Sequence, residues 1–157
     1  MKRKLPAILT AIVLVLSMAL TLTACQSTRT PISAEVFQQK AEAVGFVVQD
    51  ISDTFEETSG VNAVKIALKD NYQVEFYDVD SVQQARDAFA QNKEVFEGAK
   101  GNVSSYSSFT GNNYAYYIQT SAGNYSVISQ IENTFIYVNA PDSVKKDAES
   151  FIKSLGY

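Results

Sequence analysis

The fold of this chain is constrained most by short segments in which apolar and polar residues alternate and which are joined by very short turns. In residues 64–69 every second residue is Val, Ile or Leu, Asp70 and Asn71 form a turn signal, and the alternation resumes over residues 72–77. A period of two is typical of a half-buried β-strand, and a two-residue connection makes neighbouring strands antiparallel. These residues therefore predict a β-hairpin.

The second half of the chain repeats this arrangement. We expect three consecutive strands there, and a further strand in the preceding segment, which is rich in Ser, Gly and Asn. The expected ranges are residues 103–109, 114–120, 125–131 and 135–139. Because parallel neighbours need long crossover connections, these short links predict a mainly antiparallel sheet, which has about six or seven strands when residues 46–48 are included.

Three segments carry apolar residues at helical spacing between start and stop signals. The expected ranges are residues 33–44, 80–98 and 141–155, with Ser33 and Asp80 placed to cap the first two helices. Ser and Asp side chains favour this position because they accept hydrogen bonds from free backbone N–H groups of the first turn. Together with the strands, the three helices predict an α+β fold in which the helices pack over the sheet.

The N-terminal 24 residues have the three parts of a secretory signal. Lys2, Arg3 and Lys4 form a positive start, residues 5–22 form an apolar run without charge, and small residues precede Cys25. This order is typical of an export signal, and the apolar run is on the short side for a membrane span, which needs about 20 residues. We therefore expect export and removal of residues 1–24.

The end of this signal, Leu22-Thr23-Ala24-Cys25, contains the one cysteine of the chain. This stretch closely resembles the lipobox of bacterial lipoproteins. The resemblance implies that the Cys25 sulfur receives a diacylglyceryl group and that cleavage between Ala24 and Cys25 leaves the cysteine as the first residue. A thiolate is suited to this alkylation because it is a strong nucleophile. An ordinary signal peptide and a short membrane helix are the alternatives.

The lipoprotein interpretation divides the chain into three parts. Residues 1–24 are the signal peptide, residues 25–32 a lipidated tether, and residues 33–157 a single α+β domain, in line with the usual domain size of roughly 100–200 residues. Acyl chains such as palmitate hold the domain on the extracytoplasmic face of the cell membrane. Residue 26 is Gln, not the Asp that retains some lipoproteins in the inner membrane of enteric bacteria, so an outer-membrane location stays open for a Gram-negative cell.

The charge of the expected mature part argues against nucleic acid as a partner. Three of the 13 Lys and Arg residues precede Cys25, whereas all 17 Asp and Glu residues follow it, so residues 25–157 carry a net charge of −7. Phosphate backbones attract basic surfaces. The chain also has no histidine, and a single cysteine allows neither an internal disulfide nor a Cys/His zinc cluster.

Catalytic signatures are absent from the sequence. It contains no Gly-x-Ser-x-Gly elbow, no phosphate-binding loop and no dinucleotide fingerprint. The acidic residues Asp50, Asp53, Glu56 and Glu57 lack the spacing of a calcium-binding loop and are better interpreted as a solvated connection. A hydrolase that uses carboxylates alone is the lowest-ranked hypothesis. We expect no enzymatic activity, no cofactor and no metal.

The least ordinary feature is a set of tyrosines among Ser, Asn and Gly, formed by Tyr106, Tyr114, Tyr116, Tyr117 and Tyr125. A rigid ring beside small polar residues is typical of recognition surfaces, whereas strand propensity and burial explain the same residues without a binding role. We predict a non-enzymatic interaction or envelope-accessory domain that binds an envelope protein. Binding of a small ligand, such as a sugar or peptide, between helices and sheet is the alternative.

Two further resemblances concern the second half of the chain and the chain as a whole, in that order. The strand meander followed by a helix led by Pro141 and Asp142 is similar to the PsbP-like α/β/α sandwich of some exported lipoproteins. The run Tyr-Gln-Val-Glu-Phe-Tyr at residues 72–77 and the closing Ser-Leu-Gly-Tyr are similar to small uncharacterised lipoproteins of Gram-positive bacteria. The resemblances imply a fold and a location and no reaction, because one fold carries many functions.

Replacing Cys25 by Ser removes the nucleophile that accepts the lipid. We expect Cys25→Ser to abolish lipidation and to move the domain into the soluble fraction, because buried acyl chains contribute about 0.8 kcal/mol per CH₂ to membrane binding. Labelling with a palmitate analogue and cell fractionation measure both effects. A variant that stays in membranes and still migrates as lipidated would contradict the lipoprotein hypothesis.

Overall fold

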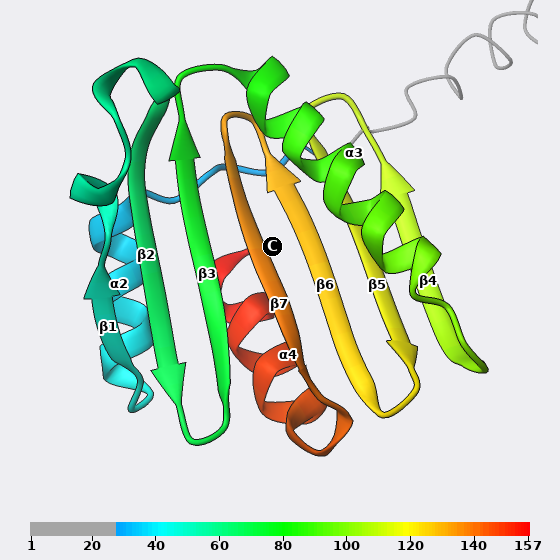
Figure 1. The fold of residues 1–157 in the computed structure, drawn as a ribbon. Coiled ribbons are helices and arrows are strands. Elements are labelled where there is room, and N and C mark those ends of the chain that lie inside the picture. The colour runs from blue at the N-terminus through cyan, green and yellow to red at the C-terminus, as the bar shows by residue number, and fades with distance from the viewer. Residues whose placement is uncertain (1–27) are drawn as a thin grey trace, which may run out of the picture.

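The computed structural model describes residues 28–157, so Ala24, Cys25 and the rest of the expected signal lie outside the described residues. The described residues form one seven-stranded antiparallel sheet and three α-helices, which confirms the predicted α+β fold (Figure 1). In chain order the elements are α2 (Ala34–Ala43), β1 (Val47–Asp50), β2 (Val61–Lys69), β3 (Tyr72–Val79), α3 (Val82–Gly98), β4 (Val103–Thr110), β5 (Tyr114–Ser121), β6 (Asn124–Ile131), β7 (Thr134–Pro141) and α4 (Lys145–Leu155).

The sheet consists of two meanders that meet in its middle. Its strand order is β1-β2-β3-β7-β6-β5-β4, and every neighbouring pair is antiparallel. After β3 the chain passes through α3 to the far edge of the sheet, where β4 begins, and the second meander returns until β7 pairs with β3. The register at this junction places Phe76 opposite Ile136 and Tyr77 opposite Phe135.

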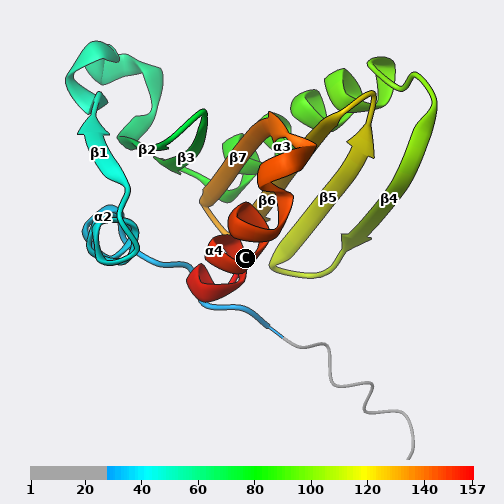
Figure 2. The same ribbon diagram turned by 90° about the horizontal axis from the view of Figure 1, so that it is seen from below.

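The helices cover the two faces of the sheet unequally. Figure 2 shows α3 on one side of the sheet and both α2 and α4 on the other, and we call these sides the α3 face and the α4 face. The core on the α4 face contains Phe37, Phe76 and Phe151, and Phe37 stacks on Phe76 with ring centroids 5.1 Å apart. The smaller core on the α3 face is built around Phe89 and Ile128. None of the helices among residues 28–157 is long and apolar enough to span a bilayer.

Two of the predicted helix starts are wrong by a few residues. Helix α3 is capped by Ser81, whose hydroxyl accepts a hydrogen bond from the Gln84 backbone N–H at 3.1 Å, and not by Asp80. The backbone N–H of Asp80 instead donates to the Gly60 carbonyl, which holds that residue outside the helix. The last helix does not begin at Pro141, because Asp142–Val144 form a 3-10 turn that precedes α4.

The other helix signals agree with the structure. Ser33 caps α2 by accepting a hydrogen bond from the Val36 backbone N–H at 3.3 Å. Gly156 follows α4 with a φ of +92°, a left-handed conformation that costs glycine little because it has no Cβ.

The first described residues pack on the domain. The Arg29 backbone N–H donates to Oδ1 of Asn113 at 3.2 Å, and Nδ2 of Asn113 donates to the Arg29 carbonyl at 2.7 Å. Ile32 packs against the core on the α4 face. The part of the expected tether that is described, residues 28–32, therefore includes residues that belong to the packed surface of the domain.

The C-terminal residue fastens this N-terminal segment. The buried Tyr157 hydroxyl hydrogen-bonds the Thr134 hydroxyl and the Ile32 backbone. The Thr134 hydroxyl in turn donates to the Ile131 carbonyl at 2.8 Å, so Tyr157 is the donor in its contact with Thr134. Burial raises the pKa of Tyr157, which keeps the phenol protonated for this role.

Tyr157→Phe removes this buried hydroxyl and leaves the ring in place. We expect a loss of about 0.5–1.5 kcal/mol in the free energy of unfolding, because the buried hydrogen bond between the Tyr157 and Thr134 hydroxyls is lost. Urea denaturation measures the loss, and Tyr106→Phe, which removes an exposed hydroxyl, should stay within about 0.5 kcal/mol of wild type. Equal stability of both variants would show that the Tyr157 hydroxyl does not hold the terminal segments.

Candidate ligand-binding groove

A cavity of about 420 Å³ lies on the α4 face between helix α4 and strands β4 to β6. We call it the α4 groove. Helix α4 packs its apolar side, including Phe151 and Ile152, in the core. In Figure 2 the two described helices on this side of the sheet, α2 and α4, lie away from β4, which leaves room for the groove. The lining comes from three places, the strands (Ser105, Tyr106, Ser107, Tyr116, Ile118, Tyr125, Val127 and Ser129), helix α4 (Lys145, Glu149, Ile152 and Lys153) and the terminal segments (Arg29 and Tyr157).

The groove carries more positive than negative charge. Arg29, Lys145 and Lys153 line it together with one carboxylate, that of Glu149. Lys153 Nζ lies 3.4 Å from the Glu149 carboxylate in an exposed ion pair, which is a weak interaction. In a chain with a net charge of −4, this local surplus of cations distinguishes the groove from the molecule as a whole.

Two of the three cations, Arg29 and Lys145, lie over aromatic rings. The Arg29 guanidinium lies 4.4 Å from the centroid of the Tyr114 ring, and Lys145 Nζ lies 5.6 Å from that of Tyr125. Lys145 Nζ also donates a hydrogen bond to Oγ1 of Thr120 at 3.1 Å. Cation–π contacts of this kind hold a charged group in place while its remaining N–H donors stay available to a ligand.

The floor of the groove provides neutral polar groups. Burial and, to a smaller degree, the nearby Glu149 carboxylate raise the pKa of Tyr125 to about 12, so the hydroxyl stays protonated at neutral pH. The exposed residues Ser105 and Ser107 line the same cavity, whereas Ser129, which also lines it, is buried and its hydroxyl donates to the Ala115 carbonyl at 3.5 Å. Hydroxyl donors, aromatic rings and ammonium groups that converge on one concave site are the arrangement expected for binding a small polar molecule.

The five tyrosines predicted as an interaction surface do not form one surface. Tyr114 and Tyr116 belong to the α4 face and Tyr117 to the α3 face, in agreement with the alternation of a strand. Tyr114, Tyr117 and Tyr125 are buried, the last two with only 1% of their area exposed, whereas Tyr106 is 65% exposed. Direct contact with a large partner is therefore limited to Tyr106 and the half-buried Tyr116.

Tyr117 has a structural role. Its hydroxyl donates to Oε1 of Gln119 at 2.7 Å, and Nε2 of Gln119 donates to the Phe96 carbonyl at 3.0 Å. This buried chain of hydrogen bonds connects β5 to α3. It explains the presence of two polar side chains beneath the helix without any binding function.

The sequence analysis missed the charged residues of the groove. Lys145, Glu149 and Lys153 are spaced by four residues, which places them along one side of α4. The sequence therefore contains the information that these three residues share one side of a helix. The sequence does not show that this side faces a cavity, because the position of α4 on the sheet decides what the side faces.

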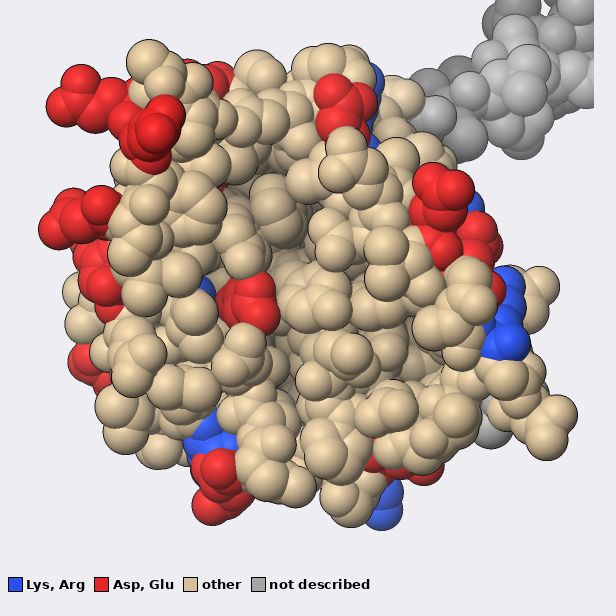
Figure 3. Space-filling model, in the orientation of Figure 1, with Lys and Arg blue, Asp and Glu red and all other residues tan. Residues whose placement is uncertain are grey.

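The opposite side of the sheet has a shallower cleft of about 220 Å³, lined by residues that include Glu75, Tyr77, Phe135 and Tyr137. In Figure 3 charged side chains gather around the periphery of this face, and its centre is largely uncharged. Tyr77 stacks on Phe135 at 4.6 Å and donates a hydrogen bond to the Glu75 carboxylate at 2.6 Å. The polar groups of this cleft are therefore engaged with one another.

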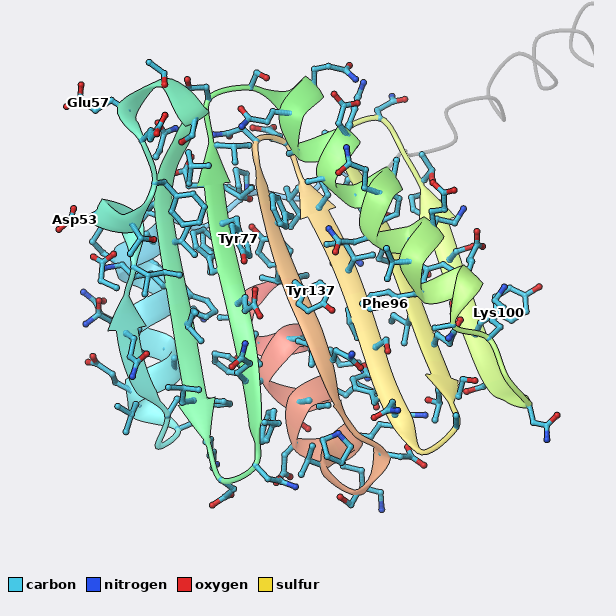
Figure 4. The ribbon with its side chains drawn as sticks, in the orientation of Figure 1. Asp53, Glu57, Tyr77, Phe96, Lys100 and Tyr137 are labelled. Carbon is cyan, nitrogen blue, oxygen red and sulfur yellow. The ribbon has the colours of Figure 1, made fainter. Side chains whose placement is uncertain are left out.

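The acidic residues Asp50, Asp53, Glu56 and Glu57 lie at the end of β1 and in the connection that follows it. Lys65 Nζ contacts the Asp50 carboxylate at 2.6 Å, and hydrogen bonds from Lys65 and Ser52 lower the pKa of Asp50 to about 2. Figure 4 shows Asp53 and Glu57 at the outer rim of the molecule, pointing away from the sheet. Within residues 28–157 no group of three or more His, Cys, Asp and Glu side chains is arranged to hold a metal ion.

Comparisons with protein-family models, with curated proteins and with solved structures find no match for this chain. The resemblances to bacterial lipoproteins and to the PsbP-like sandwich therefore stay predictions. The observations that bear on function are the geometry of the α4 groove and the N-terminal sequence.

Nitration of tyrosine rings tests this placement of the tyrosines. At pH 8 we expect tetranitromethane to modify Tyr106 first and to leave Tyr117 and Tyr125 unmodified, because nitration requires an accessible phenolate and burial raises the pKa of Tyr125. Peptide mapping by mass spectrometry identifies the modified rings, and unfolding in urea should remove the difference. Early nitration of Tyr117 or Tyr125 in the folded protein would contradict the structure.

Proposed function

We propose that this chain is an extracytoplasmic lipoprotein, anchored by lipid on Cys25, whose domain binds a small polar ligand without catalysing a reaction. The N-terminal sequence supports the anchor, and the α4 groove supports the binding function. The single observation that carries the binding proposal is the convergence of Arg29, Lys145 and Lys153 with hydroxyl groups on one cavity of about 420 Å³.

The chemistry of the groove favours a ligand with an acidic group. A carboxylate or phosphate on the ligand would accept charge-assisted hydrogen bonds from the two lysines or from Arg29. The half-buried ring of Tyr116 offers apolar contact area to the body of the ligand, such as a sugar ring or a short peptide. A nucleic acid is disfavoured by the net charge of −4.

The anchor and the groove lie close together in the chain. Arg29 lines the groove only a few residues after the predicted lipidation site at Cys25. Under this proposal the lipid would hold the groove near the membrane surface. The ligand would then be a component of the envelope or a solute that passes through it.

A domain that binds an envelope protein is the second candidate. The observation in its favour is the exposure of two aromatic residues on β4, Tyr106 at 65% and Phe109 at 42%. Exposed aromatic residues are enriched at protein interfaces.

Adjacent lysines on α4 provide a matched test of ligand binding. Lys145 lines the groove, whereas Lys146 is exposed and lies outside the groove lining. We expect acidic sugars or short acidic peptides, screened beside their neutral counterparts, to raise the melting temperature. At a ligand concentration 100-fold above Kd, binding raises the free energy of unfolding by about 2.7 kcal/mol. Lys145→Gln should weaken binding about tenfold or more, and Lys146→Gln should leave it unchanged, because only Lys145 reaches the ligand.

The ligand-free melting temperature of each variant serves as the control for folding, since Lys145 also contacts Thr120. Equal loss of affinity in both variants would indicate a diffuse charge effect in place of a site. If no acidic compound raises the melting temperature, the ligand class is wrong.

A further inference from the structure

Strand β4 leaves one of its edges unpaired. Among residues 28–157 it is the last strand of the sheet order and pairs only with β5, and Figure 1 shows it at the margin of the sheet. Residues 105–110 are all exposed. An unpaired strand edge presents a row of free N–H and C=O groups that can pair with another strand.

Most exposed edges are protected from such pairing, and β4 has little protection. Residues 103–110 contain neither a charged residue nor a proline. A bulge interrupts the pairing with β5 between Val103 and Ser105, and from Ser105 to Thr110 the register is regular. The other edge strand, β1, has only four residues and is therefore a poorer template. The structure thus contains one long edge that is suited to accept a further strand.

The sequence of this edge is symmetric about Tyr106. Residues 103–109 are Val-Ser-Ser-Tyr-Ser-Ser-Phe, which has the same kinds of residue at equal distances on either side of the tyrosine. In an antiparallel pairing of two copies centred on Tyr106, tyrosine lies opposite tyrosine and Ser105 opposite Ser107. Directly opposed aromatic pairs are favourable in a sheet, and this register opposes no like charges.

We propose that two copies of this chain dimerise through β4, with Tyr106 on the two-fold axis, so that the two sheets form one continuous sheet. A second copy is the occupant that the symmetric edge specifies, because a symmetric dimer requires a surface that complements itself.

The charges near the axis are balanced within each copy. Lys100 Nζ lies 4.9 Å from the centroid of the Tyr106 ring and 3.8 Å from the Glu97 carboxylate. The pair of opposed rings would therefore have one ammonium group beside each tyrosine, with a carboxylate close to each ammonium. These contacts already exist within each copy, so the proposed pairing requires no new charge partner near the axis.

The two-fold axis of an antiparallel strand pair is perpendicular to the sheet, so each face of one copy continues into the same face of the other. Both α4 grooves, and both Arg29 residues that begin the packed chain, therefore lie on the same side of the dimer. This geometry lets two lipid anchors enter one membrane, a consequence that rests on the proposed lipoprotein function. The pairing itself does not depend on that function.

Cysteine cross-linking tests the register directly. Opposed residues of neighbouring strands have Cβ atoms about 4.5–5.5 Å apart, close to the separation in a disulfide. We choose the full chain in detergent with Cys25→Ala, so that an introduced cysteine is the only thiol. Tyr106→Cys should form a disulfide-linked dimer under mild oxidation, as judged by non-reducing electrophoresis. Ser108→Cys, equally exposed but away from the axis, should not.

Cross-linking of both variants, of neither, or of Ser108→Cys alone would overturn the proposed register. The Cys25→Ala background cannot carry the lipid, so a negative cross-linking result does not bear on the lipoprotein proposal. Conversely, absence of lipid on Cys25 in the unmodified protein would not bear on the dimer.

A second measurement uses charge in place of a thiol. In sedimentation at high micromolar concentration we expect the otherwise unmodified Cys25→Ala chain to dimerise and Tyr106→Lys to be monomeric, because two ammonium groups would lie directly opposite each other. Ser108→Lys places its charge opposite a serine and should remain dimeric. Melting temperatures show whether each variant is folded. A monomeric unmodified chain, or equal dissociation of both variants, would overturn the proposal.

Discussion

Three helices cannot cover both faces of a seven-stranded sheet, and the surface of this protein follows from that mismatch. A helix is about 10 Å wide with its side chains and neighbouring strands are about 4.8 Å apart, so one helix covers roughly two strands. The α3 face has one helix and the α4 face has two. Each face therefore keeps strands without a helix, and both cavities described above lie next to such strands.

The two uncovered regions differ in chemistry. On the α3 face, aromatic rings and the Glu75 carboxylate satisfy one another, as in the stacking of Tyr77 on Phe135. On the α4 face, the charged side of α4 faces strands that carry serine and tyrosine, and Arg29 adds a third cation. The shortage of helices therefore has a different result on each face. On the α3 face Tyr77 and Glu75 bond to each other, and on the α4 face the cations of the groove remain partly exposed.

The second meander begins at an unprotected edge of the sheet. Strand β4 lies at the far margin of the sheet, where the chain arrives after crossing the α3 face through α3. Its uncharged, symmetric sequence is unusual for an unprotected edge, since natural edges are usually protected by charge, proline or short length. Pairing with a second copy would remove this edge and leave the grooves on a common side.

The sequence by itself determined the local elements, and only the tertiary structure decided how they meet. Alternation and turn residues predicted the hairpins and the α+β class, and Ser33 and Gly156 marked helix ends correctly, because these features depend on neighbours in the chain. The cap of α3 was missed because the contact of Asp80 with Gly60 is long-range. The burial of Tyr117 and Tyr125, and the meeting of Arg29 with Lys145 and Lys153, depend on which strands the helices cover. That choice depends on packing between distant segments, which a local pattern does not contain.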